Sequence, residues 1–254
     1  MTMPVSPLLN EQTVKQVVDV HRRLYDGPEI DRRLREIIRE FPDSKLSEWD
    51  TLRILREARA VLFDVHVEMV SGHHTATYLR FESIARVSQL ITVIARDMSD
   101  WIRHRCQQGP VTGLIVTSSA AQVLAERVVD LLHEQHRLRL VVTPFDEHTG
   151  RIGTDIVGGA IRAGERFFVL NDVTTRGQCV SKLAKVVTDH GGSVAGMMVF
   201  ARRDSGQFPL MGELTAHHPF YYTVDVQMPQ WESDRCPLCR EGRPLLSWKD
   251  MPEL

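Results

Sequence analysis

Lysine is scarce in this sequence. Only five of its 31 basic residues are lysines, so arginine carries nearly all of the positive charge. The net charge is −2, and neither a basic stripe nor an acidic tail stands out. Bulk electrostatics therefore identify no partner, and a nucleic-acid partner would need a local basic patch.

Long apolar runs are also missing. None approaches the roughly 20 residues that span a bilayer, and the N-terminus lacks the basic-then-apolar order of a signal peptide. We therefore expect a cytoplasmic protein with no membrane partner. The four cysteines are too few and too unevenly spaced for a disulfide framework, and only Cys236 and Cys239 look paired.

The 254 residues fit one large domain or a core domain with an appendage. Residues 1–61 have apolar positions at helical spacing, and Ser47 with Asp50 predicts a capping box at the start of a third helix. We interpret this segment as an N-terminal helical extension that packs on the core or on a second subunit. The alternative is a recognition module for DNA or for another protein.

From residue 62 to 228 the pattern changes to strands that alternate with helices. Such alternation predicts right-handed crossovers and an α/β fold with a mainly parallel sheet flanked by helices. Ligands of such sheets bind at the carboxyl ends of the strands. Residues 229–254 show no periodic apolar pattern and are expected to form an irregular tail. The predicted strands are 114–117, 138–143, 167–170 and 194–200, with helices at 120–132 and 180–189.

The segment RFFVLNDVTTRGQCVSKLAKVV, residues 166–187, combines a buried strand, a polar pair and a loop that opens a helix. Free N–H groups at a helix start form an anion site, and Gly177 lets the main chain approach the anion closely. Asp172 stands where a carboxylate can accept hydrogen bonds from sugar hydroxyls. The segment thus predicts a site for a phosphorylated ribose.

These residues resemble the signature of type I phosphoribosyltransferases, whose strand, acidic pair and Thr/Gly phosphate loop match NDVTTRGQC. Three further segments resemble orotate phosphoribosyltransferases, which are the nearest subfamily. They are VSGHHTATYLR at 70–80, TDIVGGAIRAGER at 154–166, taken as a short hairpin, and CPLCREGRPL at 236–245. The resemblance covers about residues 62–246.

The resemblance implies that phosphoribosyl pyrophosphate (PRPP) or a nucleotide binds with Mg²⁺, that ribose 5-phosphate is transferred to or from a pyrimidine-like base, and that the protein is a homodimer. It implies a catalytic set, a phosphate-binding set and a base-binding set. The catalytic set is Asp172, His148 and Arg151. The phosphate-binding set is Asn171, Asp172, Val173, Thr174, Thr175, Arg176, Gly177, Gln178, Cys179, Ser118 and Ser119, and the base-binding set is Arg202, Arg203 and Tyr78.

The sequence departs from the family pattern in two places. Asn171 replaces the first acidic residue, and the loop TPFDEHTGRIG at 143–153 has two carboxylates where lysines are expected to reach the pyrophosphate. Arg176 inside the phosphate loop is expected to compensate. Two hypotheses follow: an active phosphoribosyltransferase, or a non-catalytic phosphoribosyl-binding protein. The second type would be a regulatory or assembly protein, or a bacterial defence effector, that engages a partner through its N-terminal helices.

Cys236 and Cys239 have the spacing of a zinc knuckle, but Zn²⁺ takes four ligands and no second cysteine pair follows. His217 with His218, or the same motif in a second subunit, are the candidates for the missing ligands. The alternative, which the lack of a second cysteine pair favours, is a turn of free thiols that packs on the sheet. The pair His73 and His74 is expected to lie near the base or at a dimer interface instead.

Overall fold

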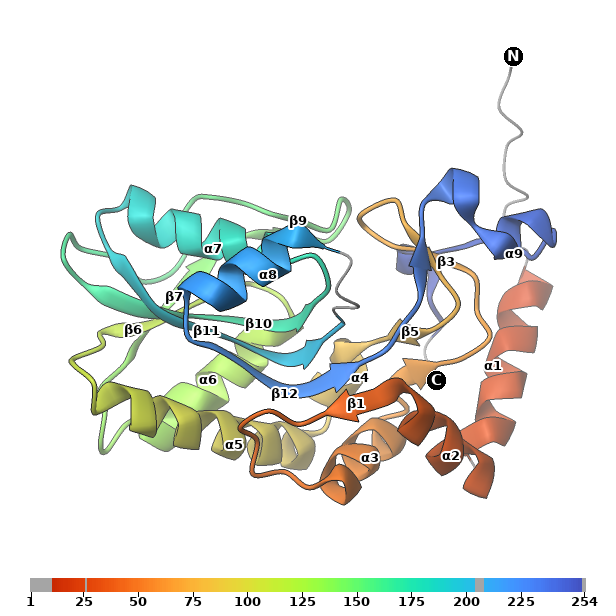
Figure 1. Cartoon of the computed structure of the whole chain (residues 1–254), viewed down its shortest axis with the longest axis horizontal. Helices are drawn as coiled ribbons and strands as arrows, with labels where there is room; N and C mark the ends of the chain where they lie inside the picture. Colours follow the sequence, from red (N-terminus) through yellow and green to blue (C-terminus); the bar gives the residue numbers. More distant parts are fainter. Residues whose placement is uncertain (1–10, 26, 204–207, 253–254) are drawn as a thin grey trace, which may run out of the picture.

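The computed structural model describes residues 11–25, 27–203 and 208–252. Its centre is a six-stranded sheet (Figure 1) in which five neighbouring strands are parallel and the edge strand β1 is antiparallel. The predicted α/β fold with a mainly parallel sheet is therefore confirmed. In spatial order the strands are β1 (Ile38–Glu40), β12 (Phe220–Val226), β11 (Ser193–Arg202), β10 (Arg166–Thr174), β6 (Gly113–Thr117) and β7 (Arg139–Thr143).

Both faces of this sheet are covered by helices, which is why its strands are continuously apolar. On β10, Phe168 and Leu170 pack on one side, while Phe167 and Val169 pack on the other. Figure 1 shows α7 and α8 above the sheet and α5 and α6 below it. The helices are α4 (Phe81–Ala85), α5 (Ser88–Cys106), α6 (Ala120–Leu132), α7 (Gln178–Asp189) and α8 (Pro209–His217).

The N-terminal segment contains α1 (Glu11–Tyr25), α2 (Pro28–Ile37) and α3 (Glu48–Glu57), and the predicted capping box at Ser47 is present. Leu34 and Leu55 are fully buried in the same core cluster as α5 and α6. Strand β1, which the sequence did not reveal, pairs with β12 through Ile38 and Val226. Residues 28–60 are thus integrated into the domain, and residue 61 is not a packing boundary.

The C-terminal residues contribute to a second, small sheet, which we call the cap sheet. It has the order β13-β4-β3-β14 and joins the tail to residues 67–75. The tail is irregular between its short elements, as expected, but its pairing was not predicted. The elements are β3 (Val67–Glu68), β4 (His74–Thr75), β13 (Gln230–Trp231), η1 (Ser233–Arg235), α9 (Pro237–Arg240), β14 (Leu246–Ser247) and η2 (Trp248–Asp250), with β2 (Val61–Leu62) paired to β5 (Tyr78–Leu79) beside them.

A short hairpin, β8 (Phe145–Asp146) and β9 (Arg151–Ile152), follows β7. The hairpin predicted at 154–166 is wrong: within the described residues 154–165 the only pairing is a bridge between Val142 and Gly158. These residues bend back along β7 instead of pairing with one another. Among the described helices, none is long and apolar enough to cross a membrane.

Candidate functional site

The strand, loop and helix predicted within residues 166–187 are formed. Strand β10 ends at Thr174, and α7 begins at Gln178 with Gly177 as its N-cap. Gly177 has φ +77°, a left-handed conformation that residues with a side chain rarely adopt. In the described part of the chain no side chain caps this helix end. Its first N–H groups are therefore available to an anion, and the helix dipole favours negative charge there.

Helix α8 packs closely on this loop. A Cβ atom added to Gly177 would lie 2.7 Å from Cδ1 of Leu214 and 3.0 Å from the sulfur of Met211. The buried Thr174 hydroxyl faces the same Met211 sulfur at 4.0 Å. The close approach of α8 and the positive φ both require glycine at this position.

Asp172 precedes the loop, and its Oδ1 accepts a hydrogen bond from the Val173 N–H at 2.7 Å. Burial, and then the negative charge of Glu82, raise the pKa of Asp172 to about 7. The side-chain amide of Asn171 is buried and donates to the carbonyl of Val173 at 3.2 Å. Asn171 thus holds the loop backbone, while Asp172 supplies the titratable group.

Glu82, on the short helix α4, was missed by the sequence analysis. Its charge acts on both Asp172 and Tyr78, and burial followed by Glu82 raises the pKa of Tyr78 to about 12. Tyr78 is therefore a neutral phenol at physiological pH. The sequence held one signal for Glu82, which is its position. It stands two residues after Arg80, the last residue of VSGHHTATYLR, in the connection between that segment and the next helix.

Arg203 follows directly after β11 and is only 4% exposed. Its main-chain N–H donates to the carbonyl of Thr174 at 2.8 Å, and its Nη1 lies 3.6 Å from the sulfur of Met69. Nε and Nη2 have no hydrogen-bond partner among the described residues. Burial lowers the pKa of Arg203 to about 10, so the guanidinium stays charged. Among the described residues, no counter-charge pairs with this buried cation beside the loop that follows β10.

Arg202, the other predicted base-binding arginine, has a different environment. Its Nη2 forms ion pairs with Asp225 at 2.7 Å and Glu40 at 3.0 Å, and its guanidinium stacks 4.1 Å from the ring centroid of Tyr222. These contacts tie β11 to β12 and β1. Arg202 thus lies opposite Thr174 in the sheet, but its side chain pairs with acidic residues of β12 and β1.

Ser118 and Ser119 follow β6, and their hydroxyl groups make local bonds. Ser119 accepts from the Ala121 N–H at 3.3 Å as the N-cap of α6. The Ser118 hydroxyl accepts from the Phe145 N–H at 2.9 Å. Both side chains therefore shape the loop between β6 and α6.

The β8–β9 hairpin carries the predicted catalytic residues His148 and Arg151, which are both exposed. Asp146 accepts from the N–H groups of His148 and Thr149 and from the Thr149 hydroxyl, so this carboxylate belongs to the turn. A Cβ atom added to Gly150 would lie 2.5 Å from Val70. The hairpin tip therefore lies against the loop that joins β3 and β4.

Two further loop residues have defined surroundings. The Arg176 guanidinium lies 5.3 Å from the ring centroid of Phe208, and the His73 ring lies 6.3 Å from the same ring. Phe208 thus links the phosphate loop to the β3–β4 loop. Burial, then the charge of Asp172, raise the pKa of the Cys179 thiol to about 11, so Cys179 is not a thiolate.

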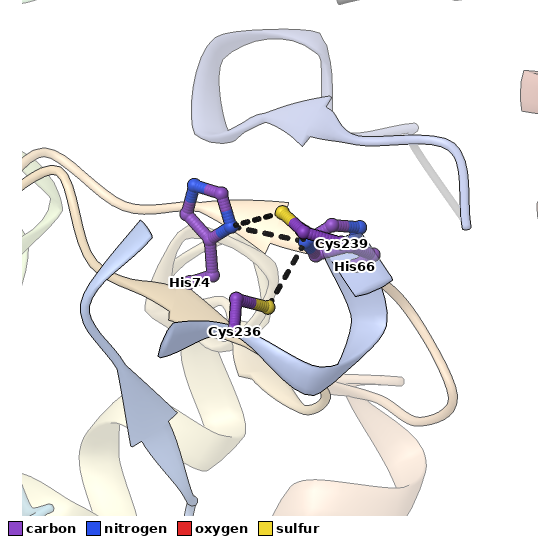
Figure 2. Close-up of side chains that lie close together, drawn as sticks. All are labelled: His66, His74, Cys236 and Cys239. Atoms are coloured by element: carbon purple, nitrogen blue, oxygen red, sulfur yellow. Dashed lines mark hydrogen bonds between the residues drawn. The ribbon is translucent and has the colours of Figure 1, made fainter. Parts of the chain in front are cut away.

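The two tail cysteines lie beside His66 and His74 (Figure 2), and the ligand atoms of these four residues are all within 4.8 Å of one another. The candidate ligand His217 lies on α8 and hydrogen-bonds through Nδ1 to the carbonyl of Glu213. The cap sheet instead places His66 and His74 beside the two cysteines, and both rings are buried there.

No family model matches the chain. The orotate phosphoribosyltransferase of Thermus thermophilus is 33% identical over 201 residues, which cover 77% of this chain and 98% of that protein. The orotate phosphoribosyltransferase of Caldanaerobacter subterraneus is 27% identical over 185 residues, covering 71% of this chain and 86% of that protein.

Solved structures of the same kind share the fold. UMP synthase of Leishmania donovani aligns with a TM-score of 0.55 at 16% identity, covering 70% of this chain and 36% of that chain. The orotate phosphoribosyltransferase of Mycobacterium tuberculosis in complex with inorganic phosphate aligns with a TM-score of 0.51 at 16% identity, covering 69% and 95%. The chain belongs to the type I phosphoribosyltransferases, and within them it is most like the orotate phosphoribosyltransferases.

Proposed function

We propose that this protein binds PRPP and transfers its ribose 5-phosphate to a pyrimidine that carries a carboxylate, with orotate as the first candidate. The buried guanidinium of Arg203, which lacks a counter-charge among the described residues, is the observation that carries the proposal. Guanidinium groups bind carboxylates through two parallel N–H···O bonds, and a buried charge gains most from such a partner. Orotate is a pyrimidine with a ring carboxylate.

The phosphate loop supplies the second half of the site. The N–H groups at the start of α7 bind the 5-phosphate, and Arg176 adds a permanent positive charge beside them. Asp172 accepts hydrogen bonds from the ribose hydroxyls in its ionised form. The main-chain bond between Arg203 and Thr174 keeps the base site next to the phosphate site, which is the positioning that transfer requires.

The donor groups also fit Mg²⁺, which the family resemblance implies. Mg²⁺ binds through one or two carboxylates together with substrate phosphates, and Asp172 and Glu82 are two carboxylates whose charges interact in the ligand-free chain. A cation between them would relieve the repulsion that contributes to the raised pKa of Asp172. Bound Mg²⁺ would supply charge neutralisation at the pyrophosphate.

A second candidate is a phosphoribosyl-binding protein without transfer activity, favoured by the β8–β9 hairpin. This hairpin carries Asp146 and Glu147 and no lysine. Its tip lies against Val70, so it is held over the β3–β4 loop in the ligand-free chain. Such a protein would bind PRPP and never consume it.

Calorimetry with PRPP and Mg²⁺, followed by a pyrophosphate-release assay with orotate or uracil, tests these alternatives. We expect binding of PRPP and turnover with orotate that greatly exceeds turnover with uracil. Arg203→Met should remove the preference for orotate and leave PRPP binding unchanged. Absence of PRPP binding would refute the whole site, and binding without pyrophosphate release would select the second candidate.

A further inference from the structure

We propose that His66, His74, Cys236 and Cys239 form a structural Zn²⁺ site that fastens the C-terminal tail to the β3–β4 segment. The four residues come from two segments that lie more than 160 positions apart in sequence. The cap sheet brings the segments together, because β13 pairs with β4 and β14 pairs with β3. Figure 2 shows the four side chains converging on a common centre.

The ligand atoms all lie within 4.8 Å of one another, and most of the measured separations are close to those of a tetrahedral zinc site. Cys236 Sγ lies 3.4 Å and Cys239 Sγ lies 3.6 Å from Nε2 of His66. Nδ1 of His74 lies 3.3 Å from Cys239 Sγ and 3.0 Å from Nε2 of His66. With Zn–S of about 2.3 Å and Zn–N of about 2.0 Å, tetrahedral ligand atoms are separated by about 3.3–3.8 Å. A metal ion fits at the centre with small adjustments of the side chains.

The surroundings of His66 fix the nitrogen that would bind the metal. Its Nδ1 lies 2.9 Å from the carbonyl oxygen of Arg243, so Nδ1 carries the proton and Nε2 faces the cluster with its lone pair. An outer hydrogen bond of this kind is the usual support of a metal-bound imidazole.

The ligand set selects the metal and the type of site. Two thiolates and two imidazoles suit Zn²⁺, whereas Mg²⁺ and Ca²⁺ take oxygen ligands. Four protein ligands leave no open position for substrate, so the site is structural. His66, His74 and Cys236 are at most 4% exposed, while Cys239 is exposed and gives the ion a route of entry.

The site also connects to the phosphate loop. His74 follows His73, whose ring packs against Phe208, and Phe208 lies under the guanidinium of Arg176. The bound metal would therefore hold the β3–β4 loop in position beside the ligand cleft. This inference does not depend on the proposed transfer reaction.

Metal analysis of the full-length chain, purified under reducing conditions and without a histidine tag, tests the proposal. We expect about one Zn²⁺ per chain. Replacement by Co²⁺ should give a thiolate-to-cobalt charge-transfer band and strong tetrahedral ligand-field bands. X-ray absorption of the zinc-loaded wild type should show two sulfur and two nitrogen neighbours. This measurement uses no variant, so its result does not depend on whether a variant folds.

Matched variants locate the site. Cys239→Ser and His74→Gln should lose at least tenfold in zinc affinity, in line with removal of one ligand. Cys106→Ser and His217→Gln should keep the wild-type zinc content, since neither residue belongs to the cluster. Three results would each overturn the proposal. The first is a reconstituted wild type that holds no more zinc than a chelator-treated sample. The others are a disulfide between Cys236 and Cys239, and an unchanged zinc affinity in Cys239→Ser.

Discussion

The main-chain N–H of Arg203 donates to the carbonyl of Thr174 at 2.8 Å, and this bond joins the end of β11 to the phosphate loop. It fixes a buried guanidinium beside Thr174, the last residue of β10 before the loop that leads into α7. Arg202, one position earlier, reaches Asp225 and Glu40 instead. The proposed role of Arg203 is in ligand binding, whereas the contacts of Arg202 are within the fold, and this difference can be measured.

Arg203→Met should stabilise the ligand-free chain, or leave it unchanged, because it removes a buried charge that lacks a counter-charge among the described residues. The same variant should bind orotate about 10- to 100-fold more weakly, the loss expected for hydrogen bonds to a charged group. Thermal unfolding and calorimetry measure the two effects. A destabilised Arg203→Met protein with normal orotate affinity would contradict the assignment.

Arg202→Met is the matched control and should show the reverse behaviour. It removes the guanidinium that pairs with Asp225, a carboxylate only 2% exposed, and should lower the free energy of unfolding by about 3 kcal/mol. Affinity for orotate should be unchanged in the fraction that folds. Denaturant unfolding of the two variants side by side makes this comparison.

The pKa of Asp172, raised to about 7 from its ordinary value of 3.8, predicts a pH dependence of stability. The folded chain holds the Asp172 proton more tightly than the unfolded chain does. The stabilising contribution is therefore complete below about pH 4 and is lost as the pH rises through 7. Asp172→Asn should flatten the decline in the free energy of unfolding across this window. Denaturant titrations at several pH values measure the difference.

The same group should release protons when the ligand binds. If Mg²⁺ and PRPP favour the ionised form of Asp172, binding at pH 6.5 should release more protons from the wild type than from Asp172→Asn. Calorimetry in buffers of different ionisation enthalpy counts these protons. Equal proton release from both proteins would show that Asp172 does not change its protonation state when the ligand binds.

Gly177→Ala should damage both stability and phosphate binding. An alanine at φ +77° costs about 1–2 kcal/mol, and its Cβ would lie 2.7 Å from Leu214. PRPP affinity should fall at least tenfold, because relief of the strain moves the N–H groups of the loop. Gly212→Ala is the control on exposed α8, where no atom lies within 4 Å of the added Cβ, and should raise stability by about 0.5–1 kcal/mol.

Asp97 connects the N-terminal segment to the sheet and should be required for stability alone. Its carboxylate is 5% exposed and accepts from the Lys45 N–H at 2.7 Å, from the Ser44 hydroxyl at 3.0 Å, and from the hydroxyl groups of Tyr221 and Thr223. Asp97→Ala should lower the free energy of unfolding by about 3 kcal/mol, because several donors lose their acceptor. PRPP affinity should not change.

The control for Asp97 lies one helical turn away. Asp100 forms half-exposed ion pairs with Lys45 and Arg103, which solvent screens. Asp100→Ala should therefore cost less than about 1 kcal/mol. Similar losses in the two variants would show that the hydrogen bonds of Asp97 do not hold the N-terminal segment.

The sequence by itself determined the features that depend on neighbouring residues. The order of strand, loop and helix at 166–187, the helix at 120–132 and the capping box at Ser47 were all predicted correctly. Each follows from periodicity or backbone conformation within a few residues, which is where sequence patterns carry physical information.

Tertiary structure decided which distant residues meet. The partners of Cys236 and Cys239 turned out to be His66 and His74, because the pairing of the cap sheet, rather than local spacing, brings them together. The path of β11 and its neighbours likewise sends Arg203 to the phosphate loop and Arg202 to Asp225. These contacts are between residues far apart in sequence, and they depend on how loops close and on the register of the strands. No local pattern in the sequence encodes them.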